Sequence, residues 1–181
     1  MIAIVDAPCV KLDRPEMGDV KRSYPTGGQE AGEDEILALE EFLPYRLVAL
    51  AEEVSRSFSQ IYAKEFGIGI PEWRVVAIIG QCHQVTAKVV GERSTMHKTK
   101  VSRAVANLEK YGLVTRTPNP EDMRESFLTL TPKGKMMYGD LVPKALAYSK
   151  MLMDALDPDH RDALEGIIAQ LTKASSTFRT P

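Results

Sequence analysis

Apolar residues recur at spacings of three and four along most of the chain, which is the period of a helix that buries one face. The longest such stretch covers residues 35–66, in which Pro44 is expected to kink or break the helix. A shorter helix is expected over residues 70–80. Two more begin at Thr131 and at Asp157, each a capping side chain followed by proline. The pattern therefore predicts a mainly α-helical protein.

The centre of the chain carries two short helical patterns and then two β-type runs. The helices are expected over residues 87–93 and 97–110, with a turn at residues 94–96 between them. Residues 113–116 (LVTR) and 126–130 (SFLTL) are predicted strands, and the polar, proline-rich segment between them is a predicted hairpin loop. This is the order of a winged helix-turn-helix, in which the hairpin forms the wing.

The second of these helices divides into an apolar face and a cationic face. Val101, Ala104, Val105 and Leu108 fall on one side. The outward positions are rich in hydrogen-bond donors: Lys98, Thr99, Lys100, Ser102, Arg103 and Asn107. A recognition helix needs such donors, because its N-terminal half enters the major groove and reads base edges. His97, at the start of the helix, is interpreted as a cap or a phosphate contact.

Charge is distributed unevenly along the chain, whose 181 residues carry a net charge of only −2. Residues 86–116 hold seven Lys or Arg against two Glu. Arg124, in the hairpin loop, is expected to reach a minor groove, and Arg116 is counted with the DNA contacts. Asp122 would repel phosphate and is assigned a structural task in the wing, pairing with a nearby Arg. A merely solvated face is the alternative for the helix alone, but the adjoining turn and basic hairpin disfavour it.

Three segments resemble the MarR family of bacterial winged helix-turn-helix transcription regulators: IPEWRVVAIIG, HKTKVSRAVANLEKYGLVTR and PEDMRESFLTLTPKG. The resemblance covers roughly residues 35–175. It rests on Ser-Arg, Leu-Glu, Gly-Leu-Val, a further Arg, Asp-x-Arg and Leu-Thr-x-x-Gly in that order. The family wing often has two arginines after its aspartate, and here one of them is Met123. That difference weakens the expected minor-groove contact without removing it.

The resemblance implies a homodimeric repressor in which helices from both ends of each chain interlock. Two recognition helices would then read a pseudo-palindromic operator with half-sites roughly 34 Å apart. The apolar surface of the first and last helices is consistent with a dimer, although packing within one chain is the alternative. The resemblance also implies a small aromatic or carboxylate-bearing effector that weakens DNA binding. Its candidate contacts are Tyr45, Arg46, Trp73 and Arg74. For Trp73 the alternative is a core position, and for Arg46 an ion pair.

These interpretations divide the chain into four parts. Residues 1–33 are an N-terminal tail, 34–66 a dimerisation helix region, 67–131 the DNA-binding lobe and 132–176 the C-terminal dimerisation helices. Two cysteines make no disulfide framework. The N-terminal residues make a poor signal peptide, and no apolar run reaches the length of a membrane span. A cytoplasmic protein without membrane contact is expected.

Other functions have less support in the sequence. Redox sensing through Cys82 is one alternative, but adjacent side chains diverge, so His83 is not an obvious activating base. A winged helix used for protein binding is a second, and it predicts an apolar or mixed outward face rather than a cationic one. The three histidines are widely spaced and lack a metal-ligand motif. The sequence also has no phosphate-binding loop and no nucleophile elbow. We therefore expect no bound metal, no cofactor and no enzymatic activity.

Overall fold

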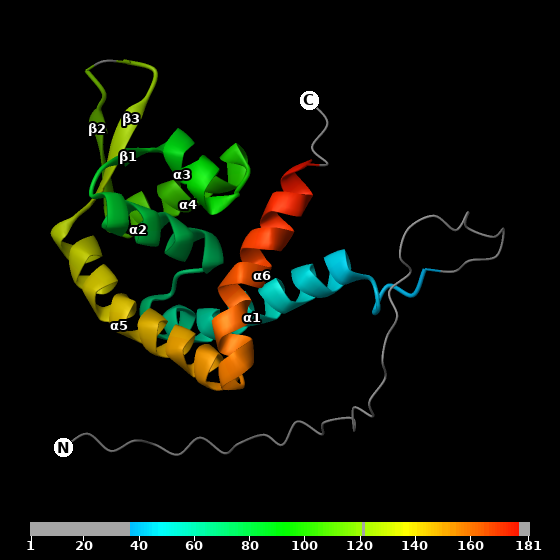
Figure 1. Ribbon diagram of the computed structural model, residues 1–181. Helices are drawn as coiled ribbons and strands as arrows, with labels where there is room; N and C mark the ends of the chain where they lie inside the picture. The colour runs from blue at the N-terminus through cyan, green and yellow to red at the C-terminus, as the bar shows by residue number, and fades with distance from the viewer. Residues whose placement is uncertain (1–36, 121, 178–181) are drawn as a thin grey trace, which may run out of the picture. The chain divides into compact units, whose positions relative to one another are not determined.

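The computed structural model describes residues 37–120 and 122–177, so the predicted tail over residues 1–33 lies outside the described residues. The described part contains six helices and three short strands (Figure 1). In chain order these are α1 (Leu43–Phe66), α2 (Ile70–Cys82), β1 (Val85–Thr86), α3 (Ala87–Ser94), α4 (Lys98–Lys110), β2 (Val114–Pro118), β3 (Ser126–Leu130), α5 (Pro132–Asp154) and α6 (Pro158–Thr177). The predicted class, mainly α with a small β-hairpin wing, is confirmed.

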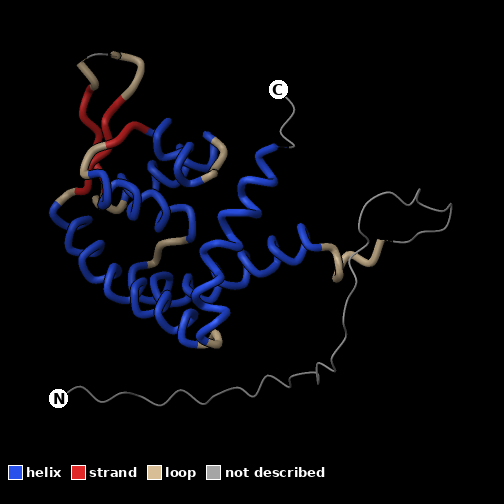
Figure 2. Tube along the Cα trace, viewed as in Figure 1, coloured by secondary structure: helices blue, strands red, loops and turns tan. Residues whose placement is uncertain are grey.

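The three strands form one antiparallel sheet in the order β1-β3-β2. Figure 2 shows them at one end of the lobe, with the β2–β3 hairpin extending beyond the helices. In the sheet Val85 pairs with Leu128 and Val114 pairs with Leu130, and all four side chains are buried. The strand β1 was not predicted, because two residues are too few to show an alternating pattern.

Two helix boundaries differ from the prediction by more than one residue. The helix expected from Glu35 is wrong over residues 37–42, since α1 begins at Leu43. Pro44 lies in the first turn of α1, where its missing N–H has no helical acceptor to lose, so it starts the helix instead of kinking it. The helix expected to close at residue 80 continues through Gly80 to Cys82.

The core of the lobe is built by the inward face of α4 against α2, α3 and the sheet. Val101, Ala104, Val105 and Leu108 are all at most 1% exposed, which confirms the predicted apolar face. Thr86 caps α3 by accepting a hydrogen bond from the backbone N–H of Val89 at 3.4 Å. Burial of one helix face in this way is what holds α4 with its opposite face outward.

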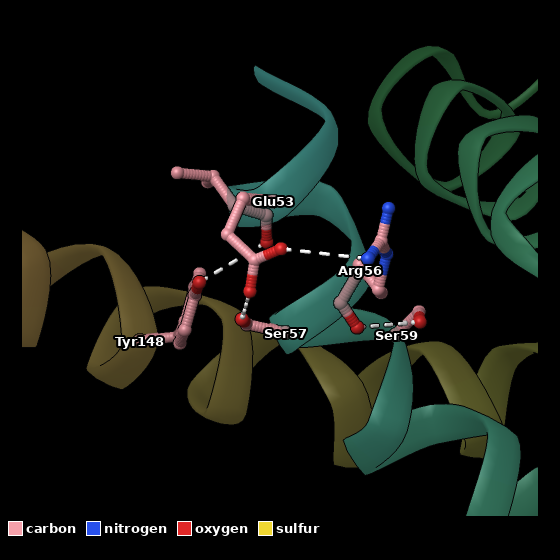
Figure 3. A network of polar contacts seen from close by, with 6 residues as sticks. Glu53, Arg56, Ser57, Ser59 and Tyr148 are labelled. Carbon is pink, nitrogen blue, oxygen red and sulfur yellow. Dashed lines mark hydrogen bonds and ion pairs between the residues drawn. The ribbon is translucent and has the colours of Figure 1, made fainter. Parts of the chain in front are cut away.

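An aromatic cluster attaches α1 and α5 to this core. The ring of Phe58 meets Tyr62 and Trp73 edge-on at centroid distances of 5.2 and 5.5 Å, and it stacks on Tyr148 at 5.3 Å. The Tyr148 hydroxyl donates to the carbonyl of Val54 on α1 at 3.0 Å, and Figure 3 shows the Tyr148 side chain reaching from α5 toward α1. The C-terminal half of α1 is therefore part of the folded core.

The first turn of α5 is joined tightly to the turn that ends α4. The Thr131 N–H donates to the Leu113 carbonyl at 3.0 Å, and its hydroxyl donates to the Gly112 carbonyl at 2.7 Å while capping α5. Gly112 has a φ of 68°, which favours glycine. A Cβ on Gly134 would lie 2.0 Å from the Leu113 carbonyl oxygen, so only glycine fits there. The Gly-Leu-Val and Leu-Thr-x-x-Gly motifs therefore act together, because their residues join the end of α4 to the start of α5.

The N-terminal half of α1 and all of α6 differ from the lobe. No residue of α6 is buried, and every residue from Leu43 to Glu53 in α1 is exposed. Large apolar side chains are among them, including Leu47, Leu50 and Ile168. Leu47 of α1 and Ile168 and Leu171 of α6 line a shared cavity of about 460 Å³. The apolar stripes predicted for these helices exist, but the described chain does not cover them.

Candidate nucleic-acid interface

The start of α4 is fixed by a side-chain cap. His97 is the N-cap residue, and its Nδ1 accepts a hydrogen bond from the backbone N–H of Thr99 at 3.4 Å. Accepting that bond satisfies one of the donors that a helix leaves unpaired at its first turn. Of the two roles proposed for His97, the cap is thus present in the structure.

The N-terminal half of α4 presents the donors that the sequence predicted on its outward side. Lys98, Thr99, Lys100, Ser102 and Arg103 are all exposed. Within the described residues, the side chains of Lys98, Lys100 and Arg103 make no hydrogen bond or ion pair. The helix dipole adds partial positive charge at the same end. The result is an uncompensated cationic surface on a helix narrow enough for a major groove.

Asn107, near the other end of α4, has an intramolecular partner. Its Nδ2 donates to Oε1 of Glu72 at 2.9 Å, and Oε2 of the same carboxylate accepts from the backbone N–H of Gly69 at 3.2 Å. Glu72 therefore caps α2 and holds α4 with one side chain. Sequence reasoning missed Glu72, although glutamate three residues after a helix N-cap is a known capping signal.

The two remaining arginines among the predicted DNA contacts are placed differently. Arg116 on β2 is paired with Glu109 of α4, Nε to Oε1 at 2.8 Å, and both side chains are partly exposed. Arg124 is exposed in the β2–β3 loop. Its backbone N–H donates to Oδ1 of Asp122 at 2.9 Å. Asp122 thus shapes the loop that carries Arg124, through the backbone of that residue.

The four candidate effector contacts do not gather at one place. Tyr45 and Arg46 are exposed in the first turn of α1. Trp73 is half-buried, with its ring stacked on Tyr62 at 5.7 Å, which is the core position weighed for it. Arg74 lines a cavity of about 700 Å³ between α1 and α2, which Lys100 of the recognition helix also lines.

Burial raises the pKa of one tyrosine of the aromatic cluster. Tyr62 is 1% exposed. Desolvation of its phenol raises its pKa to about 12, with smaller opposing contributions from Arg74 and Glu72. The phenol therefore stays neutral in the folded protein over the whole physiological range.

The cysteine weighed as a redox centre has an unforeseen neighbour. Cys82 is half-buried, and Nη1 of Arg93 lies 2.9 Å from its sulfur and 3.4 Å from Oε1 of Gln81. The adjacent His83 is exposed.

Within the described residues, no three His, Cys, Asp or Glu side chains are grouped to hold a metal ion. None of the described helices is both long and apolar enough to cross a bilayer.

A recognition helix with an uncompensated cationic face, preceded by a short helix and followed by a hairpin, defines a winged helix-turn-helix. Residues 68–126 match the model of the MarR family. The regulator SarZ of Staphylococcus saprophyticus is 27% identical over 127 residues, which cover 70% of this chain and 84% of SarZ. An organic hydroperoxide resistance transcriptional regulator of Bacillus subtilis is 24% identical over 101 residues, covering 56% of this chain and 68% of its own length.

Solved structures agree with this assignment. A MarR family transcriptional regulator from Silicibacter pomeroyi superposes with a TM-score of 0.66 at 27% identity, over 77% of this chain and 98% of that chain. A mutant MarR from Escherichia coli, complexed with operator DNA, superposes with a TM-score of 0.66 at 20% identity, over 75% of this chain and 99% of its own, and shows the shared fold. The family model over residues 68–126, the curated relatives and the solved structures all support the MarR family of winged helix-turn-helix transcriptional regulators.

Proposed function

We propose that this regulator is a cytoplasmic repressor that binds a pseudo-palindromic operator as a homodimer and is released by a small aromatic or carboxylate-bearing effector. The observation that carries the DNA-binding part is the surface formed by Lys98, Lys100 and Arg103. These cations share the N-terminal half of α4 and have no partner within the described residues. Arginine and lysine suit the O6 and N7 acceptors of guanine, and both suit phosphate.

The other predicted DNA contacts fall into two groups: exposed residues that could contact DNA, and residues already bonded within the protein. Thr99 and Ser102 are exposed beside the cations and suit base edges or phosphate. Arg124 is exposed on the wing, where a narrow minor groove would attract it. Arg116 and Asn107 already have partners in Glu109 and Glu72. We therefore assign Arg116 and Asn107 to positioning the interface, and direct readout to the first half of α4.

Homodimer formation is supported by the uncovered apolar faces of α1 and α6. Soluble monomers rarely leave large contiguous apolar patches exposed, and such patches mark interaction sites. A second copy would cover the surface around Leu47, Leu50 and Ile168 with the same surface of its own, as a two-fold axis requires. Residues 34–66 and 132–176 would then supply the dimerisation helices, and residues 67–131 the DNA-binding lobe.

The effector part is supported by the cavity between α1 and α2. Its lining includes three cations, Arg56, Arg74 and Lys100, against one acid, Glu52. A carboxylate bound there would be attracted by Arg74 and Arg56. Such a ligand favours release only if it binds the DNA-free arrangement of the dimer more tightly. Tyr45 and Arg46 remain candidates for contacts made across the dimer.

Salt dependence tests the DNA reading most directly. Each phosphate contact lowers the slope of log affinity against log salt by about 0.9, so binding to a palindromic duplex should weaken steeply as salt rises. A flat response would instead favour the winged helix as a protein-binding surface. Arg103→Ala should weaken operator binding by about 1–3 kcal/mol if Arg103 reads a base edge. Lys150→Ala, which removes a cation paired with Asp154 on α5, is the matched control.

The effector reading has its own test. A thermal-shift screen of aromatic acids and their thioesters should find compounds that raise the melting temperature of the protein. Arg74→Gln should remove the part of that response that arises at the α1–α2 cavity, while leaving operator affinity in place. Stabilisation by no compound, or a stabilisation that Arg74→Gln reduces for none of the compounds, would contradict the assignment of the effector to the α1–α2 cavity.

A further inference from the structure

A second cavity lies on the lobe. It shares no lining residue with the α1–α2 cavity. It has a volume of about 590 Å³ and is enclosed by the end of α2, the central strand β3 and the start of α5. The lining residues are Ile79, Gly80, His83, Thr129, Leu130, Lys135 and Tyr138. None of them is acidic. An apolar wall with a few polar groups is the usual composition of a small-molecule site.

The polar groups on its edge have no other engagement. Within the described residues, the side chains of His83, Lys135 and Tyr138 make no hydrogen bond or ion pair. They come from two different elements, α5 and the end of α2, and meet at one cavity. Leu130 and the half-buried Tyr138 ring form its apolar part, with the fully buried Ile79 behind them. A ligand that satisfies this set carries an anionic group at one end and an apolar body at the other.

His83 adopts a conformation that a side chain disfavours. Its φ is 64° and its ψ is −44°, and the backbone N–H of Gln84 donates to the carbonyl of Cys82 at 2.7 Å across it. This is a γ-turn with positive φ at its centre, the rarer and strained form. Glycine would occupy the position without strain. Strained residues concentrate at ligand sites, and the outlier here lines a cavity.

One part of the cavity lining depends on a close approach between α2 and α5. A Cβ on Gly80 would lie 2.5 Å from the ring of Tyr138. The absence of a side chain at Gly80 therefore lets the Tyr138 ring lie directly against α2. That contact fixes the position of the Tyr138 ring, which lines one side of the cavity.

We propose that this cavity, formed by α2, β3 and α5, is a binding site for small organic acids, with Lys135 and His83 on the carboxylate and Leu130 and the Tyr138 ring on the apolar body. It is separate from the effector cavity at Arg74, and it does not depend on DNA binding. A bound acid would connect the end of α2 to the first turn of α5 across the central strand of the sheet.

The test uses the full chain with phenylacetate as the probe and its neutral amide, phenylacetamide, as the charge control. Calorimetric titration should detect phenylacetate in the millimolar range and phenylacetamide much more weakly. Lys135→Gln should weaken phenylacetate binding about tenfold, because a hydrogen bond to a charged group is lost. Lys133→Gln is the matched control, since Lys133 donates to the Tyr111 carbonyl and does not line this cavity.

A second variant separates binding from folding. His83→Gly relieves the positive φ, so the variant should be at least as stable as the parent protein, yet bind phenylacetate several-fold more weakly. A purely structural role for His83 predicts no loss of binding. Absence of binding to the parent protein, unchanged binding in Lys135→Gln, or complete loss in Arg74→Gln alone would each overturn the proposal. Loss of binding in Lys135→Gln with an intact Arg74-dependent response in the effector screen would support two separate sites.

Discussion

The DNA-binding lobe and the terminal helices are built from similar amphipathic patterns, yet only the lobe buries its apolar side. Leu128 at the centre of the sheet is 0% exposed, whereas Leu50 on α1 is 61% exposed and Ile168 on α6 is 55% exposed. The lobe completes its core within one chain. The terminal helices have the same kind of stripe with nothing from the described chain against it. An apolar stripe thus predicts burial, but it does not tell which molecule provides the other surface.

The largest expected difference between the two regions is in a pair of leucine truncations. Leu128→Ala should lower the free energy of unfolding by about 2–5 kcal/mol, because it leaves a cavity in a closed core. Leu50→Ala should change it by less than about 0.5 kcal/mol at protein concentrations where only monomer is present. Urea unfolding measures both. Equal losses in the two variants would mean that α1 is buried within its own chain.

Tyr62 lies in the part of α1 that is packed into the core. The dependence of stability on alkaline pH tests how completely its side chain is buried. Its folded pKa of about 12 lies above its usual value of 10.0. Below pH 10 the neutral phenol contributes its full stabilisation. As pH rises from 10 to 12 the unfolded chain ionises first, so the protein loses about 3 kcal/mol of stability through this group. In Tyr62→Phe that part of the alkaline loss should disappear, and an unchanged pH profile would contradict the burial argument.

The next prediction concerns the exposed apolar surface of α6 and the association of two copies of the chain. Ile168→Glu places a charge in the apolar surface of α6 and should raise the dissociation constant of the proposed dimer at least 30-fold, or about 2 kcal/mol. The lobe should remain folded, because α6 has no buried residue in the described chain. Gln170→Glu adds the same charge at another exposed position of α6 and serves as control. Sedimentation measures the association, and identical sedimentation of both variants and the parent would remove the dimer interface from α6.

The smallest expected effect lies inside the lobe, at the bond between α4 and α2. Asn107→Ala removes the hydrogen bond to Glu72 and should cost about 1 kcal/mol of stability. In a Glu72→Gln background the same change should cost less, since the charged acceptor is already gone. If Asn107 instead reads a base, operator affinity would fall with no loss of stability, and our assignment of Asn107 to positioning would be wrong.

The parts of the fold that local patterns determine were predictable from the sequence. The inward face of α4 and the existence of both hairpin strands follow from periodicity and turn residues, although β2 runs to Pro118, two residues into the predicted loop. The start of α1 was misplaced because the apolar spacing continues through residues 37–42, whereas the proline fixes the first turn at Leu43. Periodicity alone does not decide between a proline inside a helix and one that begins it.

The candidate site was only partly predictable, because side-chain partners come from distant segments. The exposed donors of α4 follow from its periodicity, but the bond from Asn107 to Glu72 joins residues 35 positions apart. Arg93 beside Cys82 and the meeting of His83 with Lys135 depend in the same way on how helices pack. Nothing in the local sequence around His83 signals its positive φ, since glycine is the residue that normally indicates that conformation.

The joint between α4, the sheet and α5 has a mechanical consequence. Thr131 is bonded to both Gly112 and Leu113, and Gly134 leaves no space between the first turn of α5 and the start of β2. Because these contacts are close, the first turn of α5 cannot rotate independently of the segment at Gly112 and Leu113. If α5 turns about its axis, the wing and the C-terminal end of the recognition helix must turn with it. Small displacements along α5 would therefore be converted into a change in the angle at which the protein meets a DNA duplex.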